Sequence, residues 1–578
     1  DKDNIYVGFA VARGCNVTIN DVVFTTSNPK TDPVAIEKPA EKVKYTKKID
    51  SPTTSGDEAY EFVYVSDVPG TLTVKNQHNQ VVVDRVDILA SADFVTEFTL
   101  EEGLNPYLVT FIPDKDYIPG ENQVLDSYEP ITMIHEVTYK SFNQEVIHVA
   151  SNGVADGEGT IESPVDIYTA TSFAQQGQTI ELLEGVYSMP QSLVISRGIN
   201  GTAEENIVLQ AKAEKRAILD FTNADGGMVL WGNYWHIENI DITNTPGNTK
   251  GLQVAGHNNV ISGVKAYNNG DTGIQISGTS AEPFEKWPTN NLILNCTSYD
   301  NIDPGQNNAD GFAAKITVGE GNVFRGCIAY NNLDDGWDLF AKIETGPIGS
   351  VRIENSLAYN NGTLTDGTGN GDGNGFKLGG DGIAVEHILV DSIAYNNNND
   401  GVTSNSNPAV VVKNIISYGN HGKNITLYGK GDGERKFVMD NVISMKGGKD
   451  DDISEMPELM SQGNYLYFGG ETINKSGQKL RDNIFESTDI TKTPVRALSG
   501  DIEMNGLFKI LDEASDDSTS VSMDEPNVYR VLSGDTLSGI ALEKYGRSQK
   551  WRVIYEANKE TIKDPNYIYI GQKLIIPE

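Results

Sequence analysis

Apolar and polar residues alternate along much of the first 140 residues of this chain. Stretches such as "YEFVYVSD", "GTLTVKNQ" and "NPYLVTFIPD" place every second side chain on one face, and turn residues separate them. This pattern predicts an immunoglobulin-like β-sandwich over residues 32–140. Residues 1–31 show two or three similar stretches, which we interpret as remnant strands of another β-sandwich module whose beginning is missing.

The middle of the chain repeats one pattern, a short β-branched stretch that leads into a tyrosine and then into asparagine. Examples are "NLILNCTSY", "NVFRGCIAY" and "EHILVDSIAY". The repeated tyrosines are Tyr267, Tyr299, Tyr330, Tyr359, Tyr395 and Tyr418, with gaps of 32, 31, 29, 36 and 23 residues. A minimal period near 23 residues with variable insertions predicts a right-handed parallel β-helix over residues 141–510. A helical solenoid fits poorly, because the runs are short and rich in glycine and asparagine.

Two kinds of polar side chain keep a constant place in this repeat. Cys296 and Cys327 each lie three residues before a tyrosine, so we expect them to stack inward on neighbouring coils as small apolar groups. A buried pair of thiols is favoured over a disulfide or a pair of metal ligands. The asparagines after each tyrosine predict, in the same way, a structural ladder at the turn of the coil and not a binding site.

The C-terminal part of the chain differs in composition from the repeat. An acidic, serine-rich linker over residues 511–527 leads into residues 528–578, which read as a strand, two helices and a closing strand. The segments "GDTL", "YG" and "GQKLIIP" resemble the lysin motif (LysM) in order and spacing. This resemblance implies binding of an N-acetylglucosamine-containing glycan, either peptidoglycan or chitin. The fold class is therefore expected to be mainly β, with a small C-terminal α/β domain.

Charge and composition narrow the choice of partners. The chain has 578 residues, with 45 Lys and Arg against 81 Asp and Glu, and its formal charge of −36 disfavours nucleic acid as a partner. Cys15, Cys296 and Cys327 are too few for a disulfide framework, and no apolar run reaches the ~18 residues of a membrane span. The chain begins at Asp1, so we interpret it as processed or as a fragment. We expect a secreted monomer, extracellular or associated with a cell wall.

Aligning the coils on their tyrosines brings polar residues from three successive coils into two columns. The first column holds Asp310, Asp335 and Asn374, and the second, three residues further on, holds Ala313, Asp338 and Lys377. Asp334 adds another carboxylate beside the first column. Because coils stack at roughly 4.8 Å, these side chains are expected to share a patch on the order of 10 Å across.

Four carboxylates at this density repel one another unless a cation lies among them. The ligands Asp310, Asp334, Asp335 and Asp338 offer only oxygen, which favours a hard ion such as Ca²⁺. Asp-Gly pairs also occur as plain turn residues, and Asp400 is interpreted that way. Asp334 and Asp338 exceed what a turn needs, so the sequence predicts a calcium site here.

A lysine one coil above a calcium site suggests a reaction on an acidic polysaccharide. Uronate polymers break by β-elimination when a base removes the C5 proton and the 4-linked oxygen leaves. Lys377, in the glycine-rich segment "GNGFKLGG", is the candidate base, provided that its pKa is depressed. Lys315 is the rival base, but we assign it to contacts with the substrate or with its neighbouring carboxylates. Asn374 is assigned to substrate binding.

Three segments resemble the signature segments of polysaccharide lyase family 9, the calcium-dependent β-helical pectate lyases. They are "NADGFAAK", "NVFRGCIAYNNLDDGWDLF" and "GNGFKLGG", in the order and spacing of that family, and the similarity covers residues 145–510. The resemblance implies a pectate-like substrate and Lys377 as the catalytic base. It implies that the calcium ligands are Asp310, Asp334, Asp335 and Asp338.

Two other functions remain open at this point. A β-helical glycoside hydrolase on pectic polymers would use the carboxylates as acid and base. A non-catalytic, wall-anchored adhesin would use the repeat as a binding surface, but it would not require a lysine beside a metal site. The sequence also leaves open which uronate polymer is the substrate: homogalacturonan, methylated pectin or rhamnogalacturonan I.

Overall fold

The computed structural model describes residues 40–212, 215–430, 433–497 and 500–511, and several shorter stretches between residues 528 and 577. The chain forms two compact units, Asp1–Ile510 and Leu511–Glu578. The strands predicted over residues 1–31 and the linker predicted over residues 511–527, apart from Leu511, lie outside the described residues. Among the residues that the structure describes, no helix is long and apolar enough to cross a membrane.

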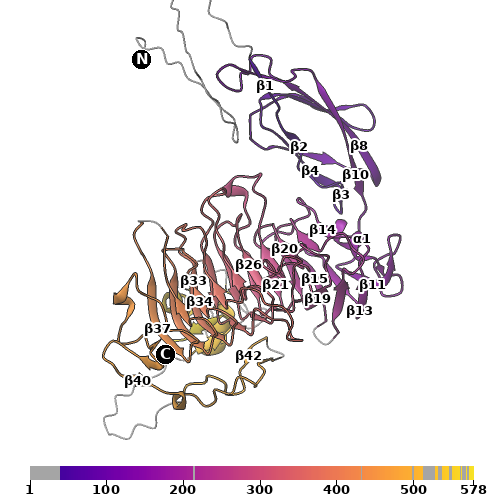
Figure 1. Cartoon of the computed structure of the whole chain (residues 1–578). Coiled ribbons are helices and arrows are strands. Elements are labelled where there is room, and N and C mark those ends of the chain that lie inside the picture. Colours follow the sequence, from indigo (N-terminus) through magenta and orange to yellow (C-terminus); the bar gives the residue numbers. More distant parts are fainter. Residues whose placement is uncertain are drawn as a thin grey trace, which may run out of the picture. The chain divides into compact units, whose positions relative to one another are not determined.

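The described part of the first unit begins with a β-sandwich (Figure 1). A five-stranded sheet in the order β3-β10-β8-β5-β6 packs against a three-stranded sheet, β2-β4-β7. The strands are β2 (Lys47–Ile49), β3 (Thr54–Ser55), β4 (Ala59–Ser66), β5 (Gly70–Lys75), β6 (Val81–Ile88), β7 (Phe94–Thr99), β8 (Gly103–Pro113) and β10 (Ile131–Tyr139), and a separate pair joins β1 (Glu41–Val43) to β9 (Gln123–Leu125). Alternate side chains such as Phe62, Val109 and Phe111 fill the core, as the period of two predicts.

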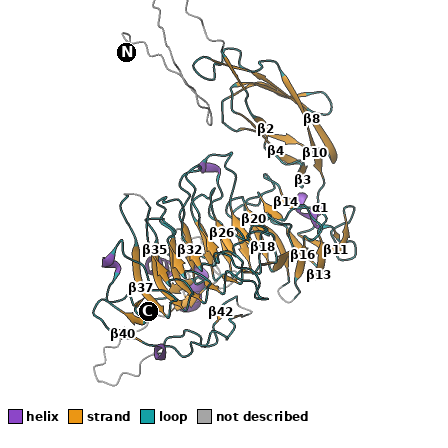
Figure 2. Cartoon of the chain, in the orientation of Figure 1, coloured by secondary structure: helices purple, strands orange, loops and turns teal. Residues whose placement is uncertain are grey.

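A long parallel β-helix follows the sandwich, and its coils are nearly all strand and turn (Figure 2). One face is a nine-stranded sheet whose strands are β14 (Leu193–Ile195), β17 (Met228–Leu230), β20 (Leu252–Val254), β23 (Ile274–Ile276), β26 (Phe312–Ala314), β29 (Trp337–Asp338), β32 (Phe376–Lys377), β34 (Val402–Thr403) and β36 (Ile425–Thr426). Every pair of neighbours in this sheet is parallel. The predicted fold class is therefore confirmed.

The remaining faces of the β-helix form one 18-stranded sheet. Its strands are β11 (Val146–Val154), β12 (Thr179–Leu182), β13 (Gly185–Ser188), β15 (Ile207–Ala211), β16 (Ala217–Asp220), β18 (Trp235–Glu238), β19 (Ile240–Thr243), β21 (Val260–Ser262), β22 (Lys265–Tyr267), β24 (Leu292–Leu294), β25 (Thr297–Tyr299), β27 (Asn322–Arg325), β28 (Ile328–Tyr330), β30 (Val351–Glu354), β31 (Leu357–Tyr359), β33 (Ile388–Tyr395), β35 (Val411–Tyr418) and β37 (Val438–Met445). Helix α1 (Ile167–Ser172) packs at the first coils, and its N-cap is Asp166.

Like side chains stack from coil to coil inside the β-helix. The rings of Phe312, Trp337 and Phe376 lie 4.8 Å apart in succession, directly beneath the strands that carry the predicted site. Cys296 and Cys327 are free and fully buried on neighbouring coils, as predicted. This close packing of identical positions gives the site a rigid floor.

The predicted asparagine ladder is present at the turn after each tyrosine. Each buried amide donates to the next side-chain carbonyl along Asn269, Asn301, Asn332, Asn361, Asn397 and Asn420, with donor–acceptor distances of 2.8–3.1 Å. Outside it, the rings of Tyr267, Tyr299, Tyr330, Tyr359 and Tyr395 stack with centroids 4.9–5.1 Å apart. Phe485, Leu507 and Phe508, from the segment after β37, pack with Tyr395 and Tyr418. The ladder satisfies polar groups that the turn would otherwise bury unpaired.

The end of the first unit contains short elements only. They are β38 (Leu466–Phe468), β39 (Glu471–Ile473), β40 (Lys479–Leu480), β41 (Val495–Arg496), β42 (Ile502–Glu503) and the 3-10 turns Pro457–Leu459 and Asp482–Ile484. In the second unit, β43 (Val528–Arg530) pairs antiparallel with β44 (Lys573–Ile575), and helices α2 (Leu537–Tyr545) and α3 (Trp551–Asn558) pack with them around Leu537, Ile540 and Ile554. This order of elements is the one predicted for the C-terminal module.

Candidate active site

The predicted columns lie on the outer face of the nine-stranded sheet. In the register of the strands, Ala313 pairs with Asp338, and Asp338 pairs with Lys377. One turn earlier, the backbone N–H of Gly311 donates to the carbonyl of Asp335, and that of Gly336 donates to the carbonyl of Asn374. A Cβ at Gly336 would lie 2.5 Å from the carbonyl oxygen of Gly375, so only glycine permits this stacking. The alignment on tyrosines therefore placed both columns correctly.

Three of the predicted ligands form a compact carboxylate cluster. One oxygen from each of Asp310, Asp334 and Asp335 lies within 4.8 Å of the others, and all three residues are buried. Asp338, 5% exposed, lies beside them, because its Oδ2 is 3.3 Å from Lys315 Nζ, and Lys315 Nζ is 2.7 Å from Asp310 Oδ2. Oδ1 of Asp334 and Oδ1 of Asp338 are buried and accept no hydrogen bond. Orphaned carboxylate oxygens facing one space fit a hard cation.

Lys377 joins the cluster from the next coil. Its Nζ is 2.9 Å from Asp335 Oδ2 and 3.9 Å from Asp338 Oδ2, and its side chain is 15% exposed. Lys315 Nζ lies between Asp310 and Asp338, with a side chain that is 11% exposed. The structure therefore brings both predicted lysines into contact with the predicted ligands. Lys315 forms ion pairs with Asp310 and Asp338, and contact with neighbouring carboxylates is one of the two roles predicted for it.

The electrostatics of the cluster reflect an excess of buried negative charge. Burial and the neighbouring carboxylates raise the pKa of Asp310 to about 7 and that of Asp334 to about 9. The pKa of Asp335 is raised mainly by burial as well. Burial lowers the pKa of Lys377, but the surrounding carboxylates, Asp338 and Asp335 above all, outweigh it and hold that pKa above its ordinary value. Four carboxylates against two lysines leave room for a further positive charge.

Asn374 orients Asp335, one of the predicted calcium ligands. Its backbone N–H and its Nδ2 both donate to Asp335 Oδ1 at 2.8 Å, and its Oδ1 accepts from the N–H of Asp400 at 3.2 Å. These contacts orient Asp335 and leave its Oδ2 to face Lys377. The prediction that Asn374 contacts the substrate stays a prediction.

Sequence reasoning missed Thr272. Its Oγ1 donates to Asp310 Oδ2 at 3.1 Å from the coil before the cluster, opposite Lys315. The signal was present, because Thr272 precedes Gly273 as Asp310 precedes Gly311, and the N–H of Gly273 donates to the carbonyl of Asp310. The column therefore begins one coil earlier than predicted.

The fold and the site together define a right-handed parallel β-helix protein with a buried carboxylate and lysine cluster on one sheet. The chain belongs to the Pel9A-like, right handed beta helix family, whose model matches residues 147–440. A LysM domain model matches residues 529–577, and the pectate disaccharide-lyase central Ig-like domain matches residues 48–126.

Curated relatives and a solved structure agree with this assignment. Pectate lyase L of Thermoclostridium stercorarium is 42% identical over 83% of this chain, and pectate lyase L of Paenibacillus polymyxa is 38% identical over 63% of it. The chain spans 38% of the length of the first relative and 81% of the second. The crystal structure of pectate lyase Pel9A superposes with a TM-score of 0.52 at 27% identity, covering 64% of this chain and 90% of that one.

Proposed function

We propose that this protein is a calcium-dependent polysaccharide lyase that cleaves 4-linked uronate polymers, with pectate as the first candidate, by β-elimination. The observation that carries the proposal is the contact of Lys377 with a buried carboxylate cluster on the nine-stranded sheet. The names of the two curated relatives described above, both pectate lyase L, support the substrate class.

The proposed calcium ligands are Asp310, Asp334, Asp335 and Asp338. The orphaned oxygens of Asp334 and Asp338 and the raised carboxyl pKa values of Asp310 and Asp334 support this assignment, because both indicate a cluster that is unfavourable as bare charge. When bound, the ion supplies a positive charge that pairs with the substrate carboxylate and with the enolate-like charge that develops on it. Thr272 and Asn374 act behind the ligands and fix the directions of Asp310 and Asp335.

Lys377 is the proposed base. It takes the proton from C5, the electron pair forms the C4–C5 double bond, the C4–O bond breaks, and the departing oxygen takes up a proton. Lys377 must be neutral for this step. Burial by itself lowers the pKa of Lys377, and a cation held by the carboxylates would offset the negative charge that raises it. Lys315 has no proton-transfer role in this scheme; in the metal-free structure burial lowers its pKa, and Asp310 and Asp338 outweigh burial and hold that pKa above the ordinary value.

One absorbance experiment separates the proposal from its alternatives. Elimination creates an unsaturated uronate that absorbs ultraviolet light, whereas a glycoside hydrolase releases reducing ends without it and an adhesin releases neither. We expect an absorbance increase on polygalacturonate with calcium, and none in excess chelator. Cleavage without an increase in ultraviolet absorbance would contradict the lyase proposal. A full reaction rate in excess chelator would contradict the calcium dependence. A panel with homogalacturonan, methylated pectin and rhamnogalacturonan I then identifies the polymer.

The domain organisation is proposed with the same boundaries as predicted. An Ig-like sandwich (32–140) precedes the catalytic β-helix (141–510), and a linker (511–527) joins it to LysM (528–578). The matched ranges 48–126, 147–440 and 529–577 support these divisions. We propose that LysM tethers a secreted monomer to N-acetylglucosamine-containing wall glycan and takes no part in the chemistry. A wall fraction that retains the full chain and releases it with soluble chitin or peptidoglycan fragments would support the tether.

A further inference from the structure

The column of the nine-stranded sheet that contains Asp338 and Lys377 continues toward the first coils with uncharged side chains. Ala313 pairs with Gln275, and Gln275 pairs with Gln253, in the column that contains Asp338 and Lys377. Gln275 is 5% exposed, and its Nε2 donates to Ser277 Oγ at 2.9 Å. Its Oε1 is buried and accepts no hydrogen bond. A buried amide oxygen without a donor is a feature that a sugar hydroxyl would satisfy.

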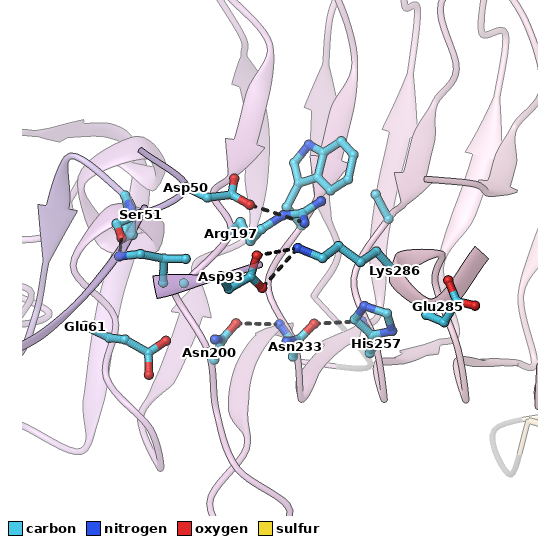
Figure 3. A pocket seen from close by; sticks show the side chains of 15 residues that line it. Asp50, Ser51, Glu61, Asp93, Arg197, Asn200, Asn233, His257, Glu285 and Lys286 are labelled. Atoms are coloured by element: carbon cyan, nitrogen blue, oxygen red, sulfur yellow. Dashed lines mark hydrogen bonds and ion pairs between the residues drawn. The ribbon is translucent and has the colours of Figure 1, made fainter. Parts of the chain in front are cut away.

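Further toward the first coils lies a pocket that is lined by residues of both the Ig-like sandwich and the β-helix. Its volume is about 270 Å³, and its lining includes Trp231 and Ala255, which directly follow β17 and β20 of the nine-stranded sheet. Asn200, Asn233 and His257 line one wall as a hydrogen-bonded row (Figure 3). The backbone N–H of Asn233 donates to Asn200 Oδ1, and the backbone N–H of His257 donates to Asn233 Oδ1. An aromatic ring with a few placed polar groups is the usual lining of a small-ligand site.

The charges of this pocket do not suit a free carboxylate. Arg197 forms a bidentate pair with Glu282 at 3.0 and 3.1 Å, and its guanidinium lies 4.8 Å from the centre of the Trp231 ring. Lys286 is 2.7 Å from Asp93 (Figure 3). Each cation is thus matched by a carboxylate, while Glu61 and Glu285 add negative charge to the rim. A uronate would meet repulsion here, whereas an uncharged sugar would not.

We propose that this pocket is a distal subsite that binds an uncharged sugar residue of the same polymer, a methyl-esterified uronate, while free uronates bind at the catalytic coils. The proposal rests on the lyase function proposed above. Five steps of register separate the coil of Trp231 from that of Lys377, roughly 24 Å at the spacing of parallel strands. A chain of several sugars therefore joins the two sites, with Gln253 and Gln275 beneath it. The site would favour partly esterified pectin.

Kinetics on long oligouronates test the subsite. Trp231→Ala is expected to raise KM for partly esterified oligomers by about 3- to 10-fold, the scale of one lost aromatic contact, with kcat retained. The same variant is expected to have a smaller effect on oligomers too short to reach the pocket. An unchanged KM on long esterified oligomers would overturn the subsite.

A charge reversal tests the basis of selectivity. Glu61→Lys, at an exposed strand position of the pocket rim, is expected to lower KM for unesterified oligomers relative to esterified ones. Glu136→Lys, the matched control, carries the same change at an exposed position of β10 that does not line the pocket. Its ratio of KM for unesterified to KM for esterified oligomers is expected to equal that of the wild type. Equal ratios in both variants would overturn the charge argument.

Calorimetry on the Lys377→Ala protein separates this inference from the lyase proposal. Esterified oligomers are expected to bind this protein, and the additional change Trp231→Ala is expected to weaken that binding. An inactive wild-type protein that still shows this difference would overturn the lyase and keep the subsite. Absence of the difference would overturn the subsite whatever the activity.

Discussion

At the scale of single residues, the proposed site consists of a lysine base and a set of carboxylates that repel one another. Lys377→Ala is expected to lower the elimination rate by ~10²–10⁴, the usual loss for a positioned base. Lys377→Arg is expected to be nearly as inactive, because arginine stays protonated at any working pH. Initial rates measured by ultraviolet absorbance check both variants. Lys413→Ala, at an exposed position of β35, is the control and is expected to keep the wild-type rate.

An active arginine variant would exclude Lys377 as the base. A second measurement distinguishes loss of the base from loss of the cluster. Calcium binding, measured by calorimetry, is expected to be retained in both variants. Loss of calcium binding together with activity would assign Lys377 to the integrity of the cluster and not to proton transfer.

The raised carboxyl pKa values predict how calcium and pH act together. A carboxyl whose pKa rises on folding, as for Asp310 and Asp334, stabilises the fold below its ordinary value of 3.8, and this contribution is lost as the pH rises through about 7 and about 9. The metal-free protein is therefore expected to lose thermal stability from acid to alkaline pH. A cation that binds only the folded state offsets the loss.

The measurement is Tm in calcium and in chelator across this pH range. The gain in Tm from calcium is expected to grow with pH, and calorimetry in two buffers is expected to show proton release on binding. A calcium gain that is constant from acid to alkaline pH would contradict the assignment of these carboxylates as ligands.

At the scale of elements, the coils are held in register by buried amides as well as by strands. Asn332 accepts from Asn301 at 2.8 Å and donates to Asn361 and to the carbonyl of Ser298 at 3.1 Å, with no exposed surface. Asn332→Ala would remove these three side-chain hydrogen bonds from a buried turn, at a total cost of about 1–3 kcal/mol. Chemical denaturation is expected to show this loss of stability.

Asn307→Ala is the matched control for the ladder. Asn307 is exposed in the loop before the site, so its removal is expected to change the free energy of unfolding by no more than ~0.5 kcal/mol. Equal effects of the two substitutions would mean that the ladder contributes no more than a surface asparagine.

At the scale of the whole molecule, the C-terminal module is a unit by itself. Its described residues have their own core, which includes Val531, Ile540 and Leu574. Deleting residues 512–578 is expected to leave turnover on soluble polymer unchanged and to abolish sedimentation with insoluble peptidoglycan or chitin, because the tether raises only the local concentration. Sedimentation assays and absorbance rates measure the two effects. A truncated protein that still sediments, or that turns over more slowly, would contradict the tether.

The repeat was readable from the sequence because a parallel β-helix reuses the same positions in every coil. The tyrosines, the asparagines and the two cysteines recur at constant offsets, and each stacks on its equivalent in the structure. Alignment on the tyrosines, with insertions allowed before Asp310 and Asn374, therefore placed Asp335 with Asn374 and Asp338 with Lys377. The sequence alignment did not identify Thr272, because its coil carries a hydroxyl where the coils of Asp310 and Asp335 carry a carboxylate.

The sequence by itself determined the fold, the modules and the residues of the candidate cluster, since local periodicity and spacing carry that information. Only the tertiary structure decided how the charges of the cluster are paired and oriented. The ion pairs of Lys315 and Lys377, the orientation of Asp335 by Asn374 and the shifted pKa values arise from burial and from contacts between coils. The pocket at Trp231 likewise depends on residues more than a hundred positions apart, such as Asp93 and Arg197. Such contacts have no fixed spacing along the chain, so no periodicity reveals them.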